Sequence, residues 1–188
     1  DQRIGSRFLR AGPGYGGSCF PKDTRAIVAT AKNFNTDLSI IKSTIKSNNL
    51  RQKILFERIK TILKNKFKYK KISFLGVTFK PNTDDMRESP SLKLIPKLHK
   101  LGAVISYYDP SGKKSTFDKY KNVNFSSKIS QACEKTDLII LHTEWNEFKN
   151  LNFKLLVKKK NFAIYDMRNI YSHKKKLTSG IKYYGIGR

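Results

Sequence analysis

The chain has 188 residues, of which 38% are hydrophobic and 12% aromatic, enough to bury a core and to exclude wholesale disorder. Its formal net charge of +25 excludes an acidic protein, and its two cysteines exclude a disulfide framework, which favours a reducing, cytoplasmic setting. No apolar run approaches the roughly 18 residues of a membrane span, and no signal peptide opens the chain, so we expect no membrane partner.

Glycines dominate the chain up to residue 17 and predict an irregular loop. A helix is predicted from about Pro21 to Lys32, because proline suits the first turn of a helix. A longer helix fits residues 38–63, where apolar residues recur mainly at steps of three and four. A long amphipathic helix of this kind is typical of a spacer between domains that also offers a dimerisation surface.

From Lys71 the pattern changes to alternating strands and helices. Strands are predicted at residues 72–77, 103–108, 137–142, 162–166 and 182–186. Helices are predicted at residues 91–101, 128–133 and 153–158. The chain is therefore expected to be an α/β protein, with part of a helical central domain at residues 1–66 and a Rossmann-like, open α/β domain at residues 67–188.

The most informative segment is residues 11–23, in which four glycines precede Cys19. Glycines let a backbone approach a bulky ligand closely, because no Cβ intervenes. Cys19 falls at the expected start of a helix, where the amides and the helix dipole favour a thiolate, and Lys22 adds a cation one turn away. The same amides are suited to an oxyanion formed when Cys19 attacks a carbonyl.

Three other readings of this segment remain. Gly12, Gly14 and Gly17 match a dinucleotide fingerprint loosely, with Asp37 about 20 residues on, but no hydrophobic strand precedes them. A phosphate-binding P-loop requires Gly-Lys-Ser/Thr, which is absent after Gly17. A glycine turn beside an inert cysteine is the remaining alternative.

A second cluster, residues 78–89, follows the first strand of the α/β domain, where such sheets bind ligands. Lys80 and Arg87 are suited to phosphate oxygens, and the carboxylates among them are suited to holding these cations or to structural ion pairs. With only Gly76 at the strand end, the unit is a poor NAD site and a better site for another nucleotide. We expect structural roles for His142, Glu144 and Trp145, and a buried, unreactive Cys133.

Residues 12–23 resemble the active-site motif of the UDP-glucose/GDP-mannose dehydrogenase family, whose cysteine is the covalent nucleophile of a four-electron oxidation of an alcohol to an acid. Further matches follow in the family's order and span the chain: residues 1–5 with 8–9, 79–90, 108–110, 143–145 and 168–169. The resemblance implies the C-terminal part of such an enzyme, without the N-terminal NAD-binding domain and inactive alone.

The resemblance also implies roles for single residues. Cys19 is then the nucleophile, and Asp23, one helical turn on, orients the hydrolytic water. Lys22 and Arg87 reach NAD, and Arg3 reaches the substrate of a neighbouring subunit, which implies a homodimer. The implied substrate-binding residues are Arg3, Phe8, Leu9, Arg10, Ala11, Gly12, Gly16, Phe79, Lys80 and Arg168.

The implied reaction converts UDP-glucose, two NAD and water into UDP-glucuronate and two NADH through a cysteine thiohemiacetal and thioester. The remaining acid, base and lysine are expected upstream of Asp1. GDP-mannose is the nearest alternative substrate, and Phe20 favours the UDP-glucose branch. Ser18, Lys22 and Asp23 argue against the UDP-N-acetylmannosamine branch.

The excess of lysine leaves a rival outside the enzyme class, a basic nucleic-acid-binding module. Binding tails usually come as blocks of like charge, whereas runs such as 158–160 and 174–176 are short and scattered. No zinc-finger, RNA-recognition or basic-zipper signature accompanies them. We therefore expect a lysine-rich solvated surface and no nucleic-acid partner.

Overall fold

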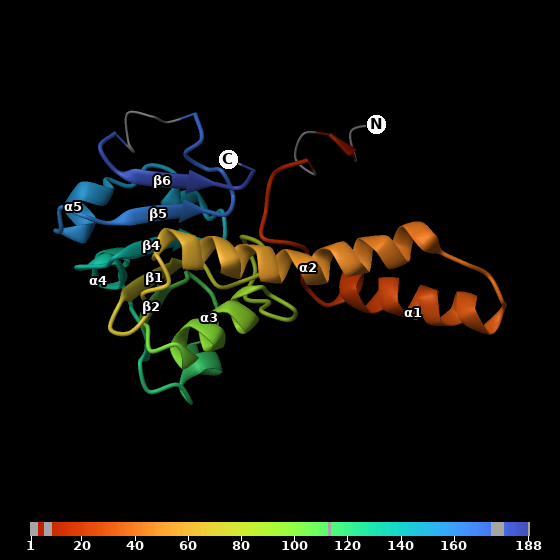
Figure 1. Ribbon diagram of the computed structural model, residues 1–188. Helices are drawn as coiled ribbons and strands as arrows, with labels where there is room; N and C mark the ends of the chain where they lie inside the picture. Colours follow the sequence, from red (N-terminus) through yellow and green to blue (C-terminus); the bar gives the residue numbers. More distant parts are fainter. Residues whose placement is uncertain (1–3, 6–8, 113, 174–178, 188) are drawn as a thin grey trace.

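The computed structural model describes residues 4–5, 9–112, 114–173 and 179–187, arranged as Figure 1 shows. Strands β1 to β6 form one parallel sheet in the order β3-β2-β1-β4-β5-β6. Their bounds are Lys71–Leu75, Val104–Tyr108, Val123–Phe125, Leu138–Leu141, Ala163–Asp166 and Lys182–Gly185. The predicted Rossmann-like α/β fold is confirmed.

Helices cover both faces of this sheet and extend beyond it (Figure 1). Helices α1 to α5 span Cys19–Asn33, Ser39–Ile62, Ser91–Lys100, Ile129–Cys133 and Phe153–Val157. Short 3-10 helices span Lys114–Phe117 and Asn146–Phe148. No helix in the part of the chain that the structure describes is long and apolar enough to cross a membrane.

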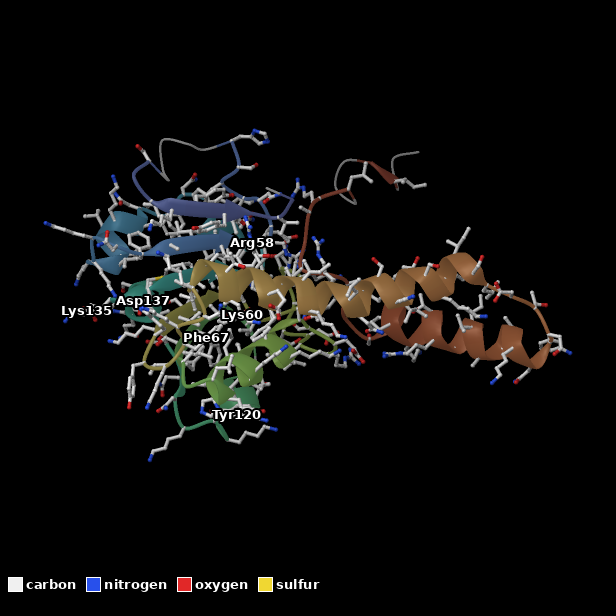
Figure 2. The ribbon with its side chains drawn as sticks, viewed as in Figure 1. Arg58, Lys60, Phe67, Tyr120, Lys135 and Asp137 are labelled. Carbon is white, nitrogen blue, oxygen red and sulfur yellow. The ribbon has the colours of Figure 1, made fainter. Side chains whose placement is uncertain are left out.

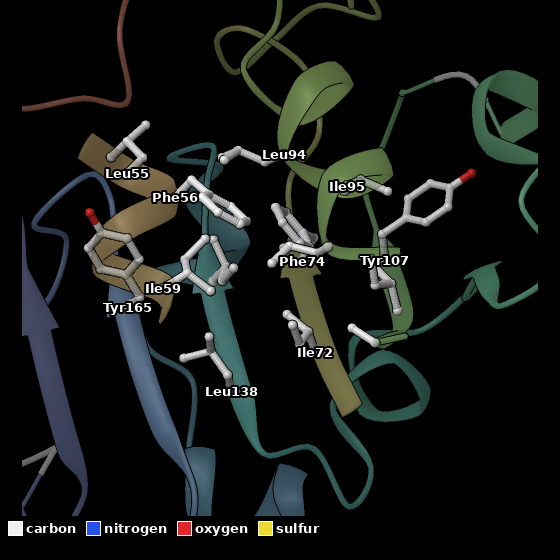
Figure 3. Close-up of a cluster of buried hydrophobic side chains, with 14 of the residues drawn as sticks. Leu55, Phe56, Ile59, Ile72, Phe74, Leu94, Ile95, Tyr107, Leu138 and Tyr165 are labelled. Atoms are coloured by element: carbon white, nitrogen blue, oxygen red, sulfur yellow. The ribbon is translucent and has the colours of Figure 1, made fainter. Parts of the chain in front are cut away.

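The strands bury both faces because their side chains alternate between two cores. Ile72 and Phe74 of β1 belong to the core beneath α2 and α3, which Figure 3 shows, whereas Leu75 packs in the core beneath α4 and α5. In β4, Leu138 and Ile140 lie in the first core. A three-layer arrangement results, with the sheet between two layers of helices.

Helix α2 belongs to two environments. Its last turns bury Leu55, Phe56 and Ile59 in the core of the sheet domain. Its first half instead lies beside α1, which buries Pro21 alone among its described residues, and this helical pair projects from the sheet domain (Figure 1). Large apolar side chains stay exposed on the pair: Phe20, Ile27, Phe34, Ile40, Leu50 and Ile54. A dimerisation surface here and the boundary at residues 66 and 67 stay predictions.

The predicted elements agree with the structure within two residues at most bounds. Helix α1 begins at Cys19, two residues before the expected Pro21. Helix α3 ends before Gly102, whose φ of +86° permits the left-handed turn that follows. Strand β3 was not predicted, because its three residues, Val123–Phe125, are too few to show an alternating pattern.

The strand order determines where a ligand site is expected on the sheet. β1 pairs with both β2 and β4, so the chain winds outward in opposite directions on either side of β1 and β4. Loops that leave neighbouring strands in opposite directions open a crevice at their carboxyl ends. The loops after β1 and β4 carry residues 76–90 and 142–152, which include the second predicted cluster.

Candidate active site

The glycine loop that precedes α1 is held against α2 by side chains of that helix. The Tyr15 amide donates to Asn48 Oδ1 at 3.0 Å, and Asn48 Nδ2 donates to the Tyr15 carbonyl at 3.2 Å. Arg51 Nη2 donates to the Gly12 carbonyl at 3.1 Å. A loop with few apolar side chains thereby gains fixed positions through its backbone groups.

The same loop lies directly on the second cluster, residues 78–89. The Gly17 amide donates to the Arg87 carbonyl at 2.8 Å. A Cβ on Gly16 would lie 2.7 Å from the Glu88 carbonyl oxygen, and one on Gly17 would lie 2.8 Å from Phe79 Cζ. The structure therefore brings together two motifs that lie about sixty residues apart in the sequence.

Replacing Gly17 with alanine is expected to detach this loop. Gly17 has a φ of +84°, so alanine adds left-handed strain to the clash with Phe79, together roughly 2 kcal/mol or more. Hydrogen exchange of the peptide around Gly17 should then accelerate by about thirtyfold or more. Gly180→Ala is the control, because φ is +73° there and the nearest atom to a new Cβ is the flexible Lys154 Nζ at 3.7 Å. Equal exchange in the two variants would contradict the close packing on Phe79.

Cys19 lies at the first position of α1 with an exposed side chain, as its predicted role requires. Its Sγ lies 3.6 Å from Ser18 Oγ. A hollow of about 590 Å³ opens in front of it. The lining residues are Gly17, Ser18, Cys19, Lys22, Arg25, Arg87 and Glu88. Three cations thus surround an exposed thiol at a helix N-terminus, a setting that favours negative charge.

Ion pairs order the cationic side of this hollow. Arg87 donates from Nε and Nη2 to the two carboxylate oxygens of Asp85, each at 3.0 Å. The hydrogen bond and the charge of Asp85 raise the pKa of Arg87, and Cys19 contributes in the same direction. Arg25 Nη2 lies 2.9 Å from Glu88 Oε1, which ties α1 to the second cluster. Sequence reasoning assigned Arg87 to the site and expected Glu88 to form an ion pair, but missed Arg25.

Lys80 and Phe79, the predicted substrate contacts, follow β1. The Phe79 ring is half-buried against Gly17, and Lys80 Nζ lies 5.3 Å from the centre of that ring. The Lys80 side chain is exposed, so its charge is accessible to an anionic ligand.

Arg168 is largely buried between the glycine loop and the loops that follow β1 and β4. Its Nε donates to the His142 carbonyl and its Nη2 to the Phe79 carbonyl, both at 2.9 Å. Nε also lies 2.8 Å from Glu144 Oε2, and Nη1 would meet a Cβ on Gly12 at 3.0 Å. Burial lowers the pKa of Arg168, against the opposing effect of Glu144. Arg168 therefore ties the carbonyls of Phe79 and His142 together and packs against Gly12, and its substrate contact stays a prediction.

The residues expected to be structural are buried or paired. His142 is fully buried, and burial followed by the charge of Arg168 lowers its pKa to about 3, so the ring is neutral. Trp145 Nε1 donates to Asp109 Oδ2 at 3.4 Å. Cys133 is buried, and burial raises its pKa to about 12, so the expected unreactive thiol agrees with the structure.

The remaining predicted residues are less constrained. Lys22 and Asp23 form an exposed ion pair at 3.4 Å on the first turn of α1. Leu9 and Arg10 are exposed, and Ala11 is half-buried. Arg3 and Phe8 lie outside the described residues, so their predicted substrate contacts stay predictions.

NAD fits the cationic rim of the hollow better than the turn after β1. Gly76 has a φ of +84°, but a Cβ there would lie 2.4 Å from Thr143 Cβ, so protein atoms fill the space in which a pyrophosphate would lie. Residues 9–11, directly before Gly12, lie in no strand, and Asp37 follows a helix, so the dinucleotide fingerprint lacks the strands that it requires. Lys22 and Arg87 present charges suited to the phosphates of a dinucleotide.

Asn48 and Arg51 bind the backbone of the glycine loop, and sequence reasoning missed them, although the sequence contained a signal. They lie three residues apart on α2, in a stripe otherwise occupied by Ile45, Leu55 and Ile59. Polar residues that interrupt an apolar helix face point to a polar partner. Here that partner is the glycine loop.

Family models match two parts of the chain. The UDP binding domain of the UDP-glucose/GDP-mannose dehydrogenase family matches residues 73–173, and the central domain of the same family matches residues 1–50. The first match covers more than half of the chain and the sheet domain from β1 to β5.

Two curated relatives and one solved structure extend this likeness. The UDP-glucose 6-dehydrogenase of Rhizobium meliloti is 39% identical over 189 residues, and that of Rickettsia typhi is 40% identical over 190. These matches cover all of this chain but 43% and 44% of the relatives, so the chain spans less than half their length. A UDP-glucose dehydrogenase structure from Pyrobaculum islandicum aligns with a TM-score of 0.79 at 26% identity, covering 98% of this chain and 40% of that one.

Proposed function

Because this chain belongs to the UDP-glucose/GDP-mannose dehydrogenase family, we propose that it supplies the catalytic cysteine and the sugar-nucleotide site of a UDP-glucose 6-dehydrogenase. The observation that carries the proposal is the contact between the loop of Cys19 and the cluster at residues 78–89. This contact sets a nucleophile beside cations that suit a diphosphate. The 39–41% identity to relatives named UDP-glucose 6-dehydrogenase supports the substrate.

In the proposed reaction the residues of this chain bind the UDP-sugar, orient it and supply the nucleophile. Lys80 and Phe79 hold the UDP-sugar, while Lys22 and Arg87 reach towards the phosphates of NAD. NAD, when bound, accepts a hydride from C6 in each of the two oxidations. Cys19 Sγ adds to the aldehyde carbon at C6, and the amides at the start of α1 stabilise the resulting oxygen anion.

The thiohemiacetal on Cys19 loses hydride to become a thioester. Water then attacks the thioester carbon, the carbon–sulfur bond breaks, and UDP-glucuronate leaves while Cys19 recovers its thiolate. Asp23, on the same face of α1 one turn after Cys19, is positioned to orient that water. We further propose that the complete enzyme is a cytoplasmic homodimer with an additional NAD-binding domain, in which Arg3 reaches the neighbouring subunit's substrate.

Calorimetry on this chain tests the choice of substrate. UDP-glucose should bind at least about tenfold more tightly than GDP-mannose, a difference of about 1.4 kcal/mol, because Phe20 favours the UDP-glucose branch of the family. Stronger binding of GDP-mannose would assign the chain to that branch of the family. Binding of neither nucleotide, with intact folding by circular dichroism, would overturn the sugar-nucleotide site itself.

Lys80→Ala is expected to weaken UDP-glucose binding by roughly 1.5–3 kcal/mol, because a charge-assisted contact to the ligand is lost. Isothermal titration of the folded variant measures the change. Lys128→Ala is the matched control, since that lysine is also exposed and follows β3 at the same edge of the sheet. Unchanged affinity for Lys80→Ala would leave Lys80 with a structural role only.

A further inference from the structure

The amino ends of the strands gather lysines that are scattered in the sequence. All six strands are parallel, so the segments that enter them meet at one edge of the sheet, opposite the edge that carries Cys19 and the loops after β1 and β4. We call this edge the basic edge. Its lysines are Lys64, Lys66, Lys68, Lys70, Lys71, Lys135, Lys158, Lys159, Lys160 and Lys182. Figure 2 shows Lys135 at this end of the sheet, far from α1.

Carboxylates do not balance these charges. The segments that enter β1, β4, β5 and β6, residues 63–71, 134–137, 158–162 and 179–182, contain Glu134 and Asp137 as their only acids, and Asp118 lies in the segment that enters β3. Asp137 Oδ1 is already bound by Lys70 at 3.2 Å and Lys159 at 2.7 Å, and Glu134 lies 3.7 Å from Lys158. Among the described residues, seven lysines have no carboxylate within 4 Å of their ammonium group: Lys64, Lys66, Lys68, Lys71, Lys135, Lys160 and Lys182.

Part of the basic edge is hollowed. A hollow of about 280 Å³ lies between the end of α2 and the starts of β5 and β6. Its walls include the buried apolar side chains of Leu63, Phe162 and Ala163. Five lysines surround it: Lys64, Lys66, Lys70, Lys160 and Lys182. Apolar walls beneath a cationic rim fit a ligand with a flat ring and attached phosphates.

An aromatic side chain stands at the same edge. Tyr69 is 77% exposed, and Lys68 Nζ lies 5.3 Å from the centre of its ring. Its backbone has a φ of +63°, which is rare for a bulky residue, and its amide donates to the Gly102 carbonyl at 2.9 Å. The fold thus presents an exposed aromatic ring between lysines in the entry to β1.

We propose that the basic edge binds single-stranded nucleic acid, with phosphates on the lysines, one base in the hollow and another on the Tyr69 ring. Unpaired bases expose faces that stack on aromatic rings, and a row of lysines follows the backbone. The edge from β1 to β6 spans about 15 Å, room for more than one phosphate. An anionic membrane fits less well, because the apolar side chains of Leu63, Phe162 and Ala163 line a recess and do not project. The opposite location of Cys19 makes this site independent of the proposed catalysis.

Fluorescence anisotropy with a labelled mixed-sequence RNA strand tests the proposal on this chain. A fourfold variant replaces Lys64, Lys66, Lys160 and Lys182 with glutamine. Its affinity should fall by at least about tenfold, and the slope of log affinity against log salt should fall by about 0.7 for each lysine that contacts a phosphate. Tyr69→Asn, which keeps a residue tolerant of positive φ but removes the ring, should weaken binding about 5- to 100-fold.

A control variant with the same loss of charge separates the basic edge from general electrostatics. It replaces four exposed lysines elsewhere, Lys32, Lys46, Lys53 and Lys128, with glutamine and should lose less than about threefold in affinity. Equal losses in the two fourfold variants would overturn the proposal. So would equal affinity for a duplex of the same length, or binding confined to phosphatidylglycerol vesicles.

Discussion

In the complete enzyme, Cys19→Ser should bind UDP-glucose almost as tightly as the unchanged protein but form UDP-glucuronate more than about 10³-fold more slowly. The side chain is exposed at the start of α1, so serine fits without repacking. A serine hydroxyl is far less acidic than a thiol, and it cannot form the thioester through which the acid is released. Chromatographic quantification of UDP-glucuronate, with calorimetry for binding, measures both halves of the expectation.

Cys133→Ala is the matched control, because it removes the other cysteine of the chain. Cys133 is buried in the core beneath α4 and α5 and does not line the hollow in front of Cys19. This variant should retain turnover within about twofold, with a modest loss of stability from the small cavity. Near-normal acid formation by Cys19→Ser would remove Cys19 from the mechanism and leave the site as a binding surface.

Much of the fold follows from local pattern. The continuous apolar run of β4, Leu138–Leu141, is a strong signal because the strand is buried on both faces, and the apolar face of α3 is a strong signal because it packs on the core beneath α2 and α3. Strand β3 carries no such signal, since it has three residues and only Val123 is buried. It forms only by pairing with β2, and this pairing depends on the arrangement of the whole sheet rather than on the local sequence.

The candidate site divides along similar lines. The position of Cys19 could be predicted, because glycines before a helix start are a local feature. The position of the glycine loop could not be predicted, because it depends on contacts with Asn48 and Arg51 of α2 and with Phe79, which are all distant in the sequence. The buried position of Arg168 likewise arises from carbonyl groups of two other loops.

The distribution of charge depends on the topology of the sheet as well as on composition. Short lysine runs in the sequence predict a diffuse surface, whereas a parallel sheet collects every entering segment at one edge. Topology therefore decides whether scattered charges act together, and the basic edge is the result.

Asp109 holds the loop that carries the proposed substrate contacts. It is 2% exposed and follows β2. Its Oδ2 accepts from the Val77 amide at 2.7 Å and from the Thr78 amide at 3.1 Å. Its Oδ1 accepts from the amides of Ser111 at 3.0 Å and Gly112 at 2.7 Å. Both oxygens thus face donors only, and Phe79 follows directly on the anchored segment.

Asp109→Ala should lower the free energy of unfolding by about 3–5 kcal/mol, because it leaves several buried amides without acceptors. Asp109→Asn should also cost about 1–3 kcal/mol, since its NH₂ group must face amide donors whichever way it is turned. Urea titration followed by far-ultraviolet circular dichroism measures both variants. Asp37→Ala, which removes an exposed carboxylate, should change stability by less than about 0.5 kcal/mol. If Asp109→Ala costs no more than Asp37→Ala, the loop after β1 does not depend on this carboxylate, and the position of Phe79 and Lys80 must be set by Arg168 and the glycine loop instead.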